Sequence, residues 1–261
     1  MPDSVLYQVS DAVAVITMNR PAAMNALTAG MKTELLAALR RASGDGPVRA
    51  VILTGSGRGF CAGQDLREHA ATLESGGAVS DTVREHYNPI VETIMTMPKP
   101  VVAAVNGVAA GAGAALALAC DFRVAARAAS FVMSFSAVGL GPDTGASWTL
   151  QRLAGGARAA ELLMLAEPVT ADRALDLGLV TSVVADGDLD DAAGSLATRL
   201  AQGPTAAYAA IKEALSFAAA HDLAESLAKE AELQGKLGRT ADHLNATLAF
   251  TRKERPAFEG R

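Results

Sequence analysis

The sequence "GRGFCAGQDL", Gly57–Leu66, decides how this chain is interpreted, because it places a nearly bare backbone directly after a strand. The preceding residues 48–56, "VRAVILTGS", form an apolar run that is typical of a buried strand. The decapeptide itself contains three glycines, one cysteine and one acid. Three kinds of chemistry fit such a loop: a cysteine nucleophile, a dinucleotide-binding turn, or backbone N–H groups that bind an oxygen.

The first two of these are weakly supported. A nucleophilic Cys61 needs a base close by, and no histidine of the chain has an obvious catalytic setting, which favours a small buried thiol. The four histidines fall mostly on polar, helix-like stretches: His69, His86, His221 and His243. Gly57, Gly59 and Ala62 match the dinucleotide pattern, but no helix begins at once and no ribose-binding acid follows about 20 residues later.

The third interpretation gains from a second glycine-rich segment, "NGVAAGAG", Asn106–Gly113. It follows another strand-like run, "VVAAV", and it opens an apolar helix. The start of a helix presents N–H groups that have no intrahelical partner, at the positive end of the helix dipole. Two such segments on neighbouring strands can each direct one N–H at a single oxygen, which makes an oxyanion hole. Tight packing of small residues in a core is the structural alternative.

Composition limits the class of protein. The chain has 261 residues, of which 50% are hydrophobic, and this suits one large domain. A net charge of −5 without a basic block argues against nucleic acid or an anionic membrane as a partner. Two cysteines and the lack of a signal-peptide pattern predict a cytoplasmic location. Val101–Cys120 is apolar enough to raise the question of a membrane span, but its Asn-Gly pair indicates a strand, a turn and a helix.

Strand and helix patterns alternate to about residue 140, and helices dominate afterwards, so the fold class is α/β with a helical C-terminal part. Thr28 is a predicted N-cap, and a turn is expected near Asp11. Strands are predicted within residues 4–20 (two strands), 48–55, 101–105, 121–126, 130–135 and 179–185. Helices are predicted within residues 26–43, 66–73, 81–98, from 111, and within 146–156, 157–166, 170–178, 189–202, 204–219 and 223–238.

Five ordered motifs resemble the crotonase (enoyl-CoA hydratase/isomerase) superfamily: "NRPAAMNAL", "GRGFCAGQDL", "KPVVAAVNGVAAGAG", "CDFRVAA" and "FSAVGLGPDTGAS". The resemblance covers nearly the whole chain and is most similar to the branch of 1,2-epoxyphenylacetyl-CoA isomerases of phenylacetate degradation. It implies a ClpP-like ββα superhelix over residues 1–200 and a helical trimerisation region over residues 201–261. It also implies acyl-CoA thioester substrates, homotrimers or hexamers, and no separate cofactor, because CoA is part of the substrate. No metal site is expected.

The resemblance assigns the two oxyanion-hole donors to the N–H groups of Gln64 and Ala112. Hydratases of the family carry two glutamates, and the matching positions here are Ala115 and Phe135, which cannot transfer protons. Asp143 stands where the isomerases of the family use a carboxylate, and one carboxylate suffices for a 1,3-proton shift. An isomerase with Asp143 as its acid/base is therefore expected. The alternatives are a helix N-cap role for Asp143, a hydratase, and a non-catalytic acyl-CoA-binding homologue.

The resemblance further implies which residues hold CoA. Asp65 is also expected to hydrogen-bond its own loop or to cap the segment after it, and Asp121 is expected to be a structural pairing or turn residue. Phe250 and Lys253 match residues that a neighbouring subunit contributes, the lysine to a CoA phosphate. The other expected contacts are Ala23, Met24, Ala26, Ala62, Gly63, Asp65, Leu66, Tyr87 and Gly111.

Overall fold

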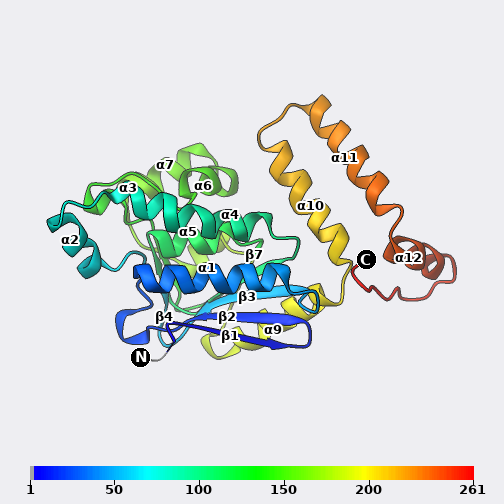
Figure 1. Ribbon diagram of the computed structural model, residues 1–261, viewed down its shortest axis with the longest axis horizontal. Coiled ribbons are helices and arrows are strands. Elements are labelled where there is room, and N and C mark those ends of the chain that lie inside the picture. The colour runs from blue at the N-terminus through cyan, green and yellow to red at the C-terminus, as the bar shows by residue number, and fades with distance from the viewer. Residues whose placement is uncertain (1–2) are drawn as a thin grey trace.

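The computed structural model describes residues 3–261, which form two β-sheets covered by helices, with a helical extension at the C-terminal end (Figure 1). The larger sheet has the strand order β1-β2-β3-β5-β7-β10, and the smaller sheet has the order β4-β6-β8-β9. The strands are β1 Val5–Ser10, β2 Val13–Met18, β3 Ala50–Gly55, β4 Gly59–Cys61, β5 Val101–Val105, β6 Val108–Ala110, β7 Phe122–Ala126, β8 Ser130–Val132, β9 Val169–Thr170 and β10 Ser182–Val184.

Three successive strand pairs build the core, β3–β4, β5–β6 and β7–β8. The first strand of each pair joins the larger sheet and the second joins the smaller one. The strands β3, β5 and β7 are parallel neighbours, and so are β4, β6 and β8. Each turn of the chain therefore lies on the previous one, and this is the expected ββα superhelix.

Helices cover both faces of the larger sheet. The strand β5 is buried at every residue, as a parallel strand between two helical layers must be. One face packs into the main core with α1, α4 and α5, and α9 covers the other face (Figure 1). The helices are α1 Ala29–Gly44, α2 Leu66–Glu74, α3 Val79–Thr82, α4 Asn88–Thr96, α5 Ala112–Ala119, α6 Ala146–Ala154, α7 Gly156–Leu165, α8 Ala171–Asp176, α9 Leu189–Ala201, α10 Thr205–Ala218, α11 Leu223–Leu237 and α12 Ala241–Thr251.

The apolar segment Val101–Cys120 forms β5, β6 and α5, so the strand, turn and helix expected there are confirmed. Every residue of α5 is buried, which explains why this helix has no polar face. Among residues 3–261, no helix has the length and apolar character needed to span a membrane. The last three helices, α10 to α12, extend away from the two-sheet core (Figure 1).

Several local predictions are confirmed and others are wrong. Asp11 and Ala12 make the turn between β1 and β2 with positive φ angles, and Thr28 caps α1 by accepting the Met31 N–H. The short strands β4, β6 and β9 were not predicted, because a strand of two or three residues carries no visible alternation. The helix predicted over residues 81–98 contains a π-helical turn at Val83–Tyr87, just before Pro89, which has no N–H to continue the regular hydrogen bonds.

Candidate active site

A cavity of about 600 Å³ opens where β4 and β6 end and α5 begins. This volume lies in the range that holds small-molecule ligands. The two glycine-rich segments form one wall, and apolar side chains, among them Phe135, Val138 and Leu140, form another. Gln64, Ala112 and Asp143, which the sequence assigned to the reaction, all line this one cavity.

The two glycine-rich segments interlock because β4 and β6 are parallel neighbours. A Cβ atom on Gly63 would stand 2.7 Å from the carbonyl oxygen of Ala110. Gly63 and Gly111 have φ angles of 84° and 49°, in the region that favours glycine. The bare backbone of the opening sequence therefore lets two strand ends approach within contact distance.

This packing leaves the two predicted N–H donors uncommitted. Ala112 is the first residue of α5, where a backbone N–H has no intrahelical acceptor. Gln64 forms a bridge with Leu27, but the bonds of that bridge are made by the neighbours of Gln64: Leu27 N–H donates to Gly63, and Asp65 N–H donates to Leu27. Within residues 3–261, neither Gln64 N–H nor Ala112 N–H donates to a backbone carbonyl.

Asp143 is the one carboxylate among the described residues that line the cavity. Burial raises the pKa of this carboxyl group, and a 2.6 Å hydrogen bond from the Thr144 hydroxyl and the charge of Lys32 oppose that rise. The alternative that Asp143 caps the following helix is wrong, because α6 begins after Gly145 and no side chain caps it. A partly desolvated carboxylate is a stronger base than one in water.

The positions that match the glutamates of the hydratases contribute no proton-transfer group. Ala115 is fully buried inside α5, and Phe135 lines the cavity with only 7% of its surface exposed. The Phe135 ring makes this side of the cavity apolar, whereas the Ala115 methyl group is not part of the cavity lining.

Lys32 is the residue of the site that sequence reasoning missed. Only 1% of it is exposed, and its ammonium group donates to Gln64 Oε1 at 3.0 Å and to Thr82 Oγ1. It also lies 4.8 Å from the centre of the Tyr87 ring. Burial lowers the pKa of Lys32, while the charges of Glu68 and Asp143 act against this change. The available signal was a charge on the apolar stripe of α1, next to Met31 and one turn from Leu35.

Tyr87 completes this network from the π-helical turn. Its hydroxyl donates to the same Gln64 Oε1 at 2.6 Å, and burial raises the pKa of Tyr87. The π turn thus carries a residue that lines the cavity, as π turns often do at functional sites.

The loops expected to hold CoA lie side by side. The Ala62 N–H donates to the Met24 carbonyl at 2.9 Å, and the Leu27 N–H donates to the Gly63 carbonyl at 2.7 Å. Asp65 accepts the N–H groups of two residues at the start of α2 and pairs with Arg20 at 2.9 Å, which confirms its capping role. The residues Ala23 and Ala26 belong to the same loop as Met24, and Leu66 lines the cavity with 60% of its surface exposed.

Two expected CoA contacts are not brought to this cavity. Phe250 is 84% exposed near the end of α12, and Lys253 follows that helix. Neither residue lines the cavity of its own chain.

Cys61 is a structural thiol, as expected from the sequence. It is fully buried, its Sγ donates to the Asn25 carbonyl at 3.3 Å, and burial raises its pKa to about 12. A thiol with so high a pKa is a poor nucleophile. Residues 3–261 also contain no group of three or more His, Cys, Asp or Glu side chains that could hold a metal ion.

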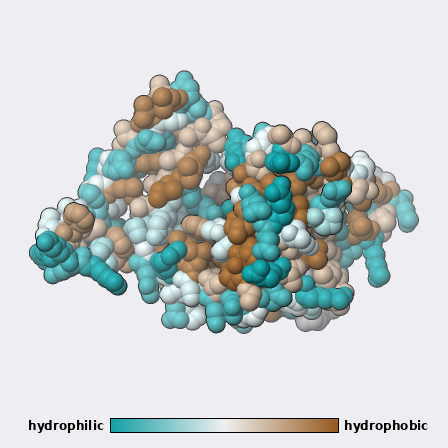
Figure 2. All heavy atoms as spheres, turned by 180° about the vertical axis from the view of Figure 1, so that it is seen from behind, coloured by the Kyte–Doolittle hydropathy of each residue, from teal (hydrophilic) through white to brown (hydrophobic). Residues whose placement is uncertain are grey.

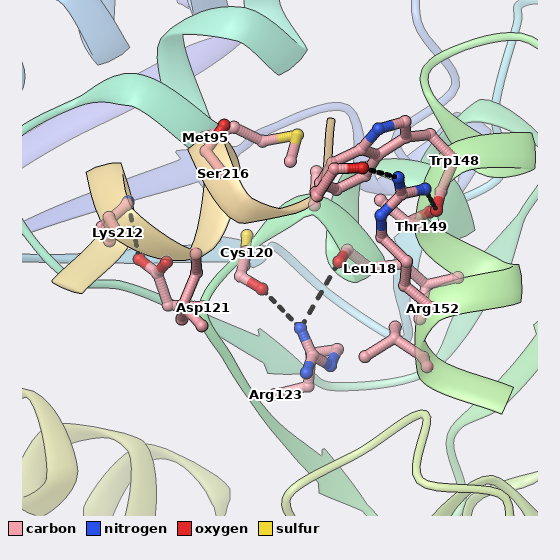
Figure 3. A pocket seen from close by; sticks show the side chains of 14 residues that line it. Met95, Leu118, Cys120, Asp121, Arg123, Trp148, Thr149, Arg152, Lys212 and Ser216 are labelled. Atoms are coloured by element: carbon pink, nitrogen blue, oxygen red, sulfur yellow. Dashed lines mark hydrogen bonds and ion pairs between the residues drawn. The ribbon is translucent and has the colours of Figure 1, made fainter. Parts of the chain in front are cut away.

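A second hollow, of about 330 Å³, lies between α10 and the core (Figure 3). Asp121 pairs there with Lys212 at 2.7 Å, which confirms its structural pairing role. Arg123 donates to the backbone carbonyls of Leu179 and Cys120. The guanidinium carbon of Arg152 lies 3.8 Å from the centre of the Trp148 ring (Figure 3). Because the charged groups at this hollow are engaged with one another or with the backbone, we assign it to the packing of α10.

Comparisons with known proteins agree with this geometry. The enoyl-CoA hydratase/isomerase family model matches residues 8–261. The chain is 46% identical to a Rhodobacter capsulatus protein named "Probable enoyl-CoA hydratase" over 99% of this chain and 98% of that protein. It is 42% identical to the 1,2-epoxyphenylacetyl-CoA isomerase of Escherichia coli over the full length of both. A crystal structure of an enoyl-CoA hydratase from Polaromonas sp. JS666 superposes with a TM-score of 0.91 at 36% identity, covering 98% of this chain and 99% of the other. The chain therefore belongs to the enoyl-CoA hydratase/isomerase family, the crotonase superfamily.

Proposed function

We propose that this protein is an acyl-CoA isomerase that shifts the double bond of an enoyl-CoA thioester, or opens a ring epoxide, with Asp143 as its single acid/base. One observation carries the proposal: a partly desolvated carboxylate shares a cavity with two uncommitted backbone N–H groups, those of Gln64 and Ala112. The carboxylate can move a proton, and the N–H groups can hold the charge that develops on a thioester oxygen.

The reaction of a 3-enoyl-CoA illustrates the roles. The thioester oxygen accepts hydrogen bonds from the N–H groups of Gln64 and Ala112. Asp143 removes a proton from C2, and the electron pair spreads over the thioester as a dienolate. The protonated Asp143 returns the same proton to C4, the double bond settles between C2 and C3, and the carboxylate is restored. Loss of one oxyanion-hole donor typically costs about 3 kcal/mol in the barrier.

Hydration is the second candidate, because the relative with 46% identity is named a hydratase and the relative with 42% identity is named an isomerase. Identity therefore does not separate the two reactions. Addition of water needs a positioned base and a positioned acid. Ala115 and Phe135 supply neither, and Asp143 is the one carboxylate among the described cavity residues. These residues favour isomerisation.

The test is the ultraviolet absorbance of a 3-enoyl-CoA mixed with the wild-type protein or with Asp143→Asn. We expect the conjugated 2-enoyl thioester to form with the wild type and at least about 100-fold more slowly with the variant. Equal rates would remove Asp143 from the mechanism. No reaction with either protein, together with CoA-ester binding by calorimetry, would favour the non-catalytic binder.

We further propose that the chains assemble as trimers or hexamers through the helical region that begins at residue 201. Figure 2 shows hydrophobic residues on the surface of the helical extension and on the neighbouring face of the core. Exposed apolar residues on the last three helices are Ile211, Leu215, Leu223, Leu227, Leu244, Leu248 and Phe250. Assembly would bury them and would bring Phe250 and Lys253 to the CoA of a neighbouring subunit. Light scattering of the wild type and of Leu248→Asp tests this assembly.

A further inference from the structure

The side-chain amide of Gln64 is held in one orientation by two hydrogen bonds to its oxygen. Its Oε1 atom accepts two hydrogen bonds, from the Lys32 ammonium at 3.0 Å and from the Tyr87 hydroxyl at 2.6 Å. An ammonium group can only donate, so the amide atom that faces Lys32 must be the oxygen. Lys32 therefore removes the ambiguity in amide orientation that most glutamine side chains carry.

This orientation leaves the amide nitrogen of Gln64 as a free donor. Within residues 3–261, Gln64 Nε2 has no hydrogen-bond acceptor, and it is not among the buried polar atoms without a partner. It is therefore accessible, and the residue that carries it lines the cavity shared by Tyr87 and Asp143. In a cavity with walls of Phe135, Val138 and Leu140, a fixed N–H₂ group is a distinct polar feature.

We propose that Gln64 Nε2 recognises an acceptor oxygen on the acyl group, so that the site takes acyl-CoA thioesters that carry an ether, epoxide or carbonyl oxygen close to the reacting carbons. This inference rests on the proposed function, since it concerns the acyl part of the same substrate. An acyl group without such an oxygen would displace water from Nε2 and leave the donor unpaired, which lowers its affinity. Lys32 acts as a positioning residue, because it does not line the cavity and reaches the substrate only through Gln64. Tyr87 lines the cavity and also positions the amide through its hydroxyl.

The test uses two inert CoA esters of nearly equal shape, 2-methoxyphenylacetyl-CoA and 2-ethylphenylacetyl-CoA. The first carries an acceptor oxygen where the second has a methylene group. We expect calorimetry to show that the wild-type protein binds the methoxy ester about three- to tenfold more tightly, as one neutral hydrogen bond allows. Equal affinities for the wild type would overturn the inference.

Substitutions at Gln64 keep the backbone N–H and change only the side chain. In Gln64→Met the ratio of the two dissociation constants should fall to about one, since the donor is gone. In Gln64→Glu the second carboxylate oxygen replaces Nε2, so the preference should reverse in favour of the ethyl ester. Gln8→Met, the same change on an exposed strand residue, is the matched control and should keep the wild-type ratio. A wild-type ratio in Gln64→Met would also overturn the inference.

The positioning role has its own readout. Tyr87→Phe and Lys32→Met each remove one donor to Oε1, so the amide gains freedom to rotate and the methoxy preference should shrink in both. If both variants keep the wild-type ratio, Lys32 and Tyr87 do not position the amide. If the wild type binds neither ester, the acyl-CoA function itself fails. If it binds both equally, only the recognition by Gln64 fails, so the two failures are distinguishable.

Discussion

Gly113 lies directly against Cys61: a Cβ atom on Gly113 would stand 2.1 Å from the Cys61 carbonyl oxygen. The contact joins α5 to β4 and brings the start of α5 next to the loop that follows β4. No side chain fits there, so the backbone of one segment would have to move.

Gly113→Ala should therefore destabilise the protein strongly, by about 3 kcal/mol or more, in chemical unfolding. Gly194 is the matched control because it also lies within a helix, α9, and a Cβ atom on it would meet nothing within 4 Å. Gly194→Ala should stabilise the protein by about 0.5–1 kcal/mol. Similar effects of the two substitutions would contradict the close contact at Cys61.

The superhelix could be predicted from the sequence because its parts are local or carried by ordered motifs. The buried strand "VVAAV" and the capped helix after Thr28 follow from their apolar patterns. The short strands β4 and β6 could not be predicted in this way, because their pairing depends on how distant turns of the chain stack. Yet these two strands bring the glycine-rich segments together.

The site was predictable in its backbone and less so in its side chains. Gln64, Ala112 and Asp143 follow from the motifs, and all three line one cavity. Lys32 could not be predicted as a site residue, because a lysine next to an apolar helical stripe can also extend along the surface with its ammonium group in water. Only the tertiary structure places Gln64 and Thr82 where they accept hydrogen bonds from that ammonium group.

Both cysteines should resist alkylation in the native protein. Cys61 and Cys120 are buried, and burial raises the pKa of each thiol to about 12. At pH 8 the thiolate fraction of either group is then negligible. Mass spectrometry after treatment with iodoacetamide at pH 8 should find neither thiol modified without denaturant and both modified in 6 M guanidinium chloride, a condition chosen for complete unfolding. Rapid native modification of Cys61 would reopen its role as a nucleophile.

Lys212 should be essential for holding α10 on the core. Its ammonium group donates to Asp121 at 2.7 Å and to the carbonyls of Ile94 and Lys99 at 3.0 and 3.1 Å. Lys212→Met removes the partner of the Ile94 and Lys99 carbonyls and the counter-charge of Asp121, whose Oδ2 then keeps only the Val101 N–H. We therefore expect a loss of about 2 kcal/mol in unfolding free energy and faster proteolysis between α9 and α10. Lys236→Met, which breaks an exposed pair on α11, is the control and should leave both measurements nearly unchanged. Equal effects of the two substitutions would show that Lys212 does not hold α10.

The charge of Lys32 should shift the pH range in which the proposed isomerase activity is observed. In the proposed reaction Asp143 acts as a base only when it is ionised, so activity should fall as the pH drops through its pKa, which burial raises. The positive charge of Lys32 lowers the pKa of Asp143, which means that Lys32→Met should move this loss of activity to higher pH. The measurement is kcat/KM against pH for both proteins. An unmoved acidic limb would show that another group controls it.

Asp143 should also reduce the stability of the fold at neutral pH. Its pKa is higher in the folded protein than in the unfolded chain, because burial disfavours the charged form. The cost of burying the carboxylate is thus fully present above the folded-state pKa, and it is released as the pH falls towards the unfolded-state pKa.

Asp143→Asn keeps an oxygen that can accept the Thr144 hydroxyl and removes the charge. We expect it to raise the unfolding free energy by about 1 kcal/mol at pH 7.5, and the gain measured by urea unfolding should shrink as the pH is lowered through the folded-state pKa of Asp143. Asp121→Asn is the contrasting control, since this carboxylate is paired with Lys212 and its loss should destabilise the protein at the same pH. A variant at position 143 that is both inactive and less stable at pH 7.5 would indicate that Asp143 supports the fold. A variant at position 143 that is inactive and more stable would indicate that the buried Asp143 carboxylate destabilises the fold and is needed for the reaction.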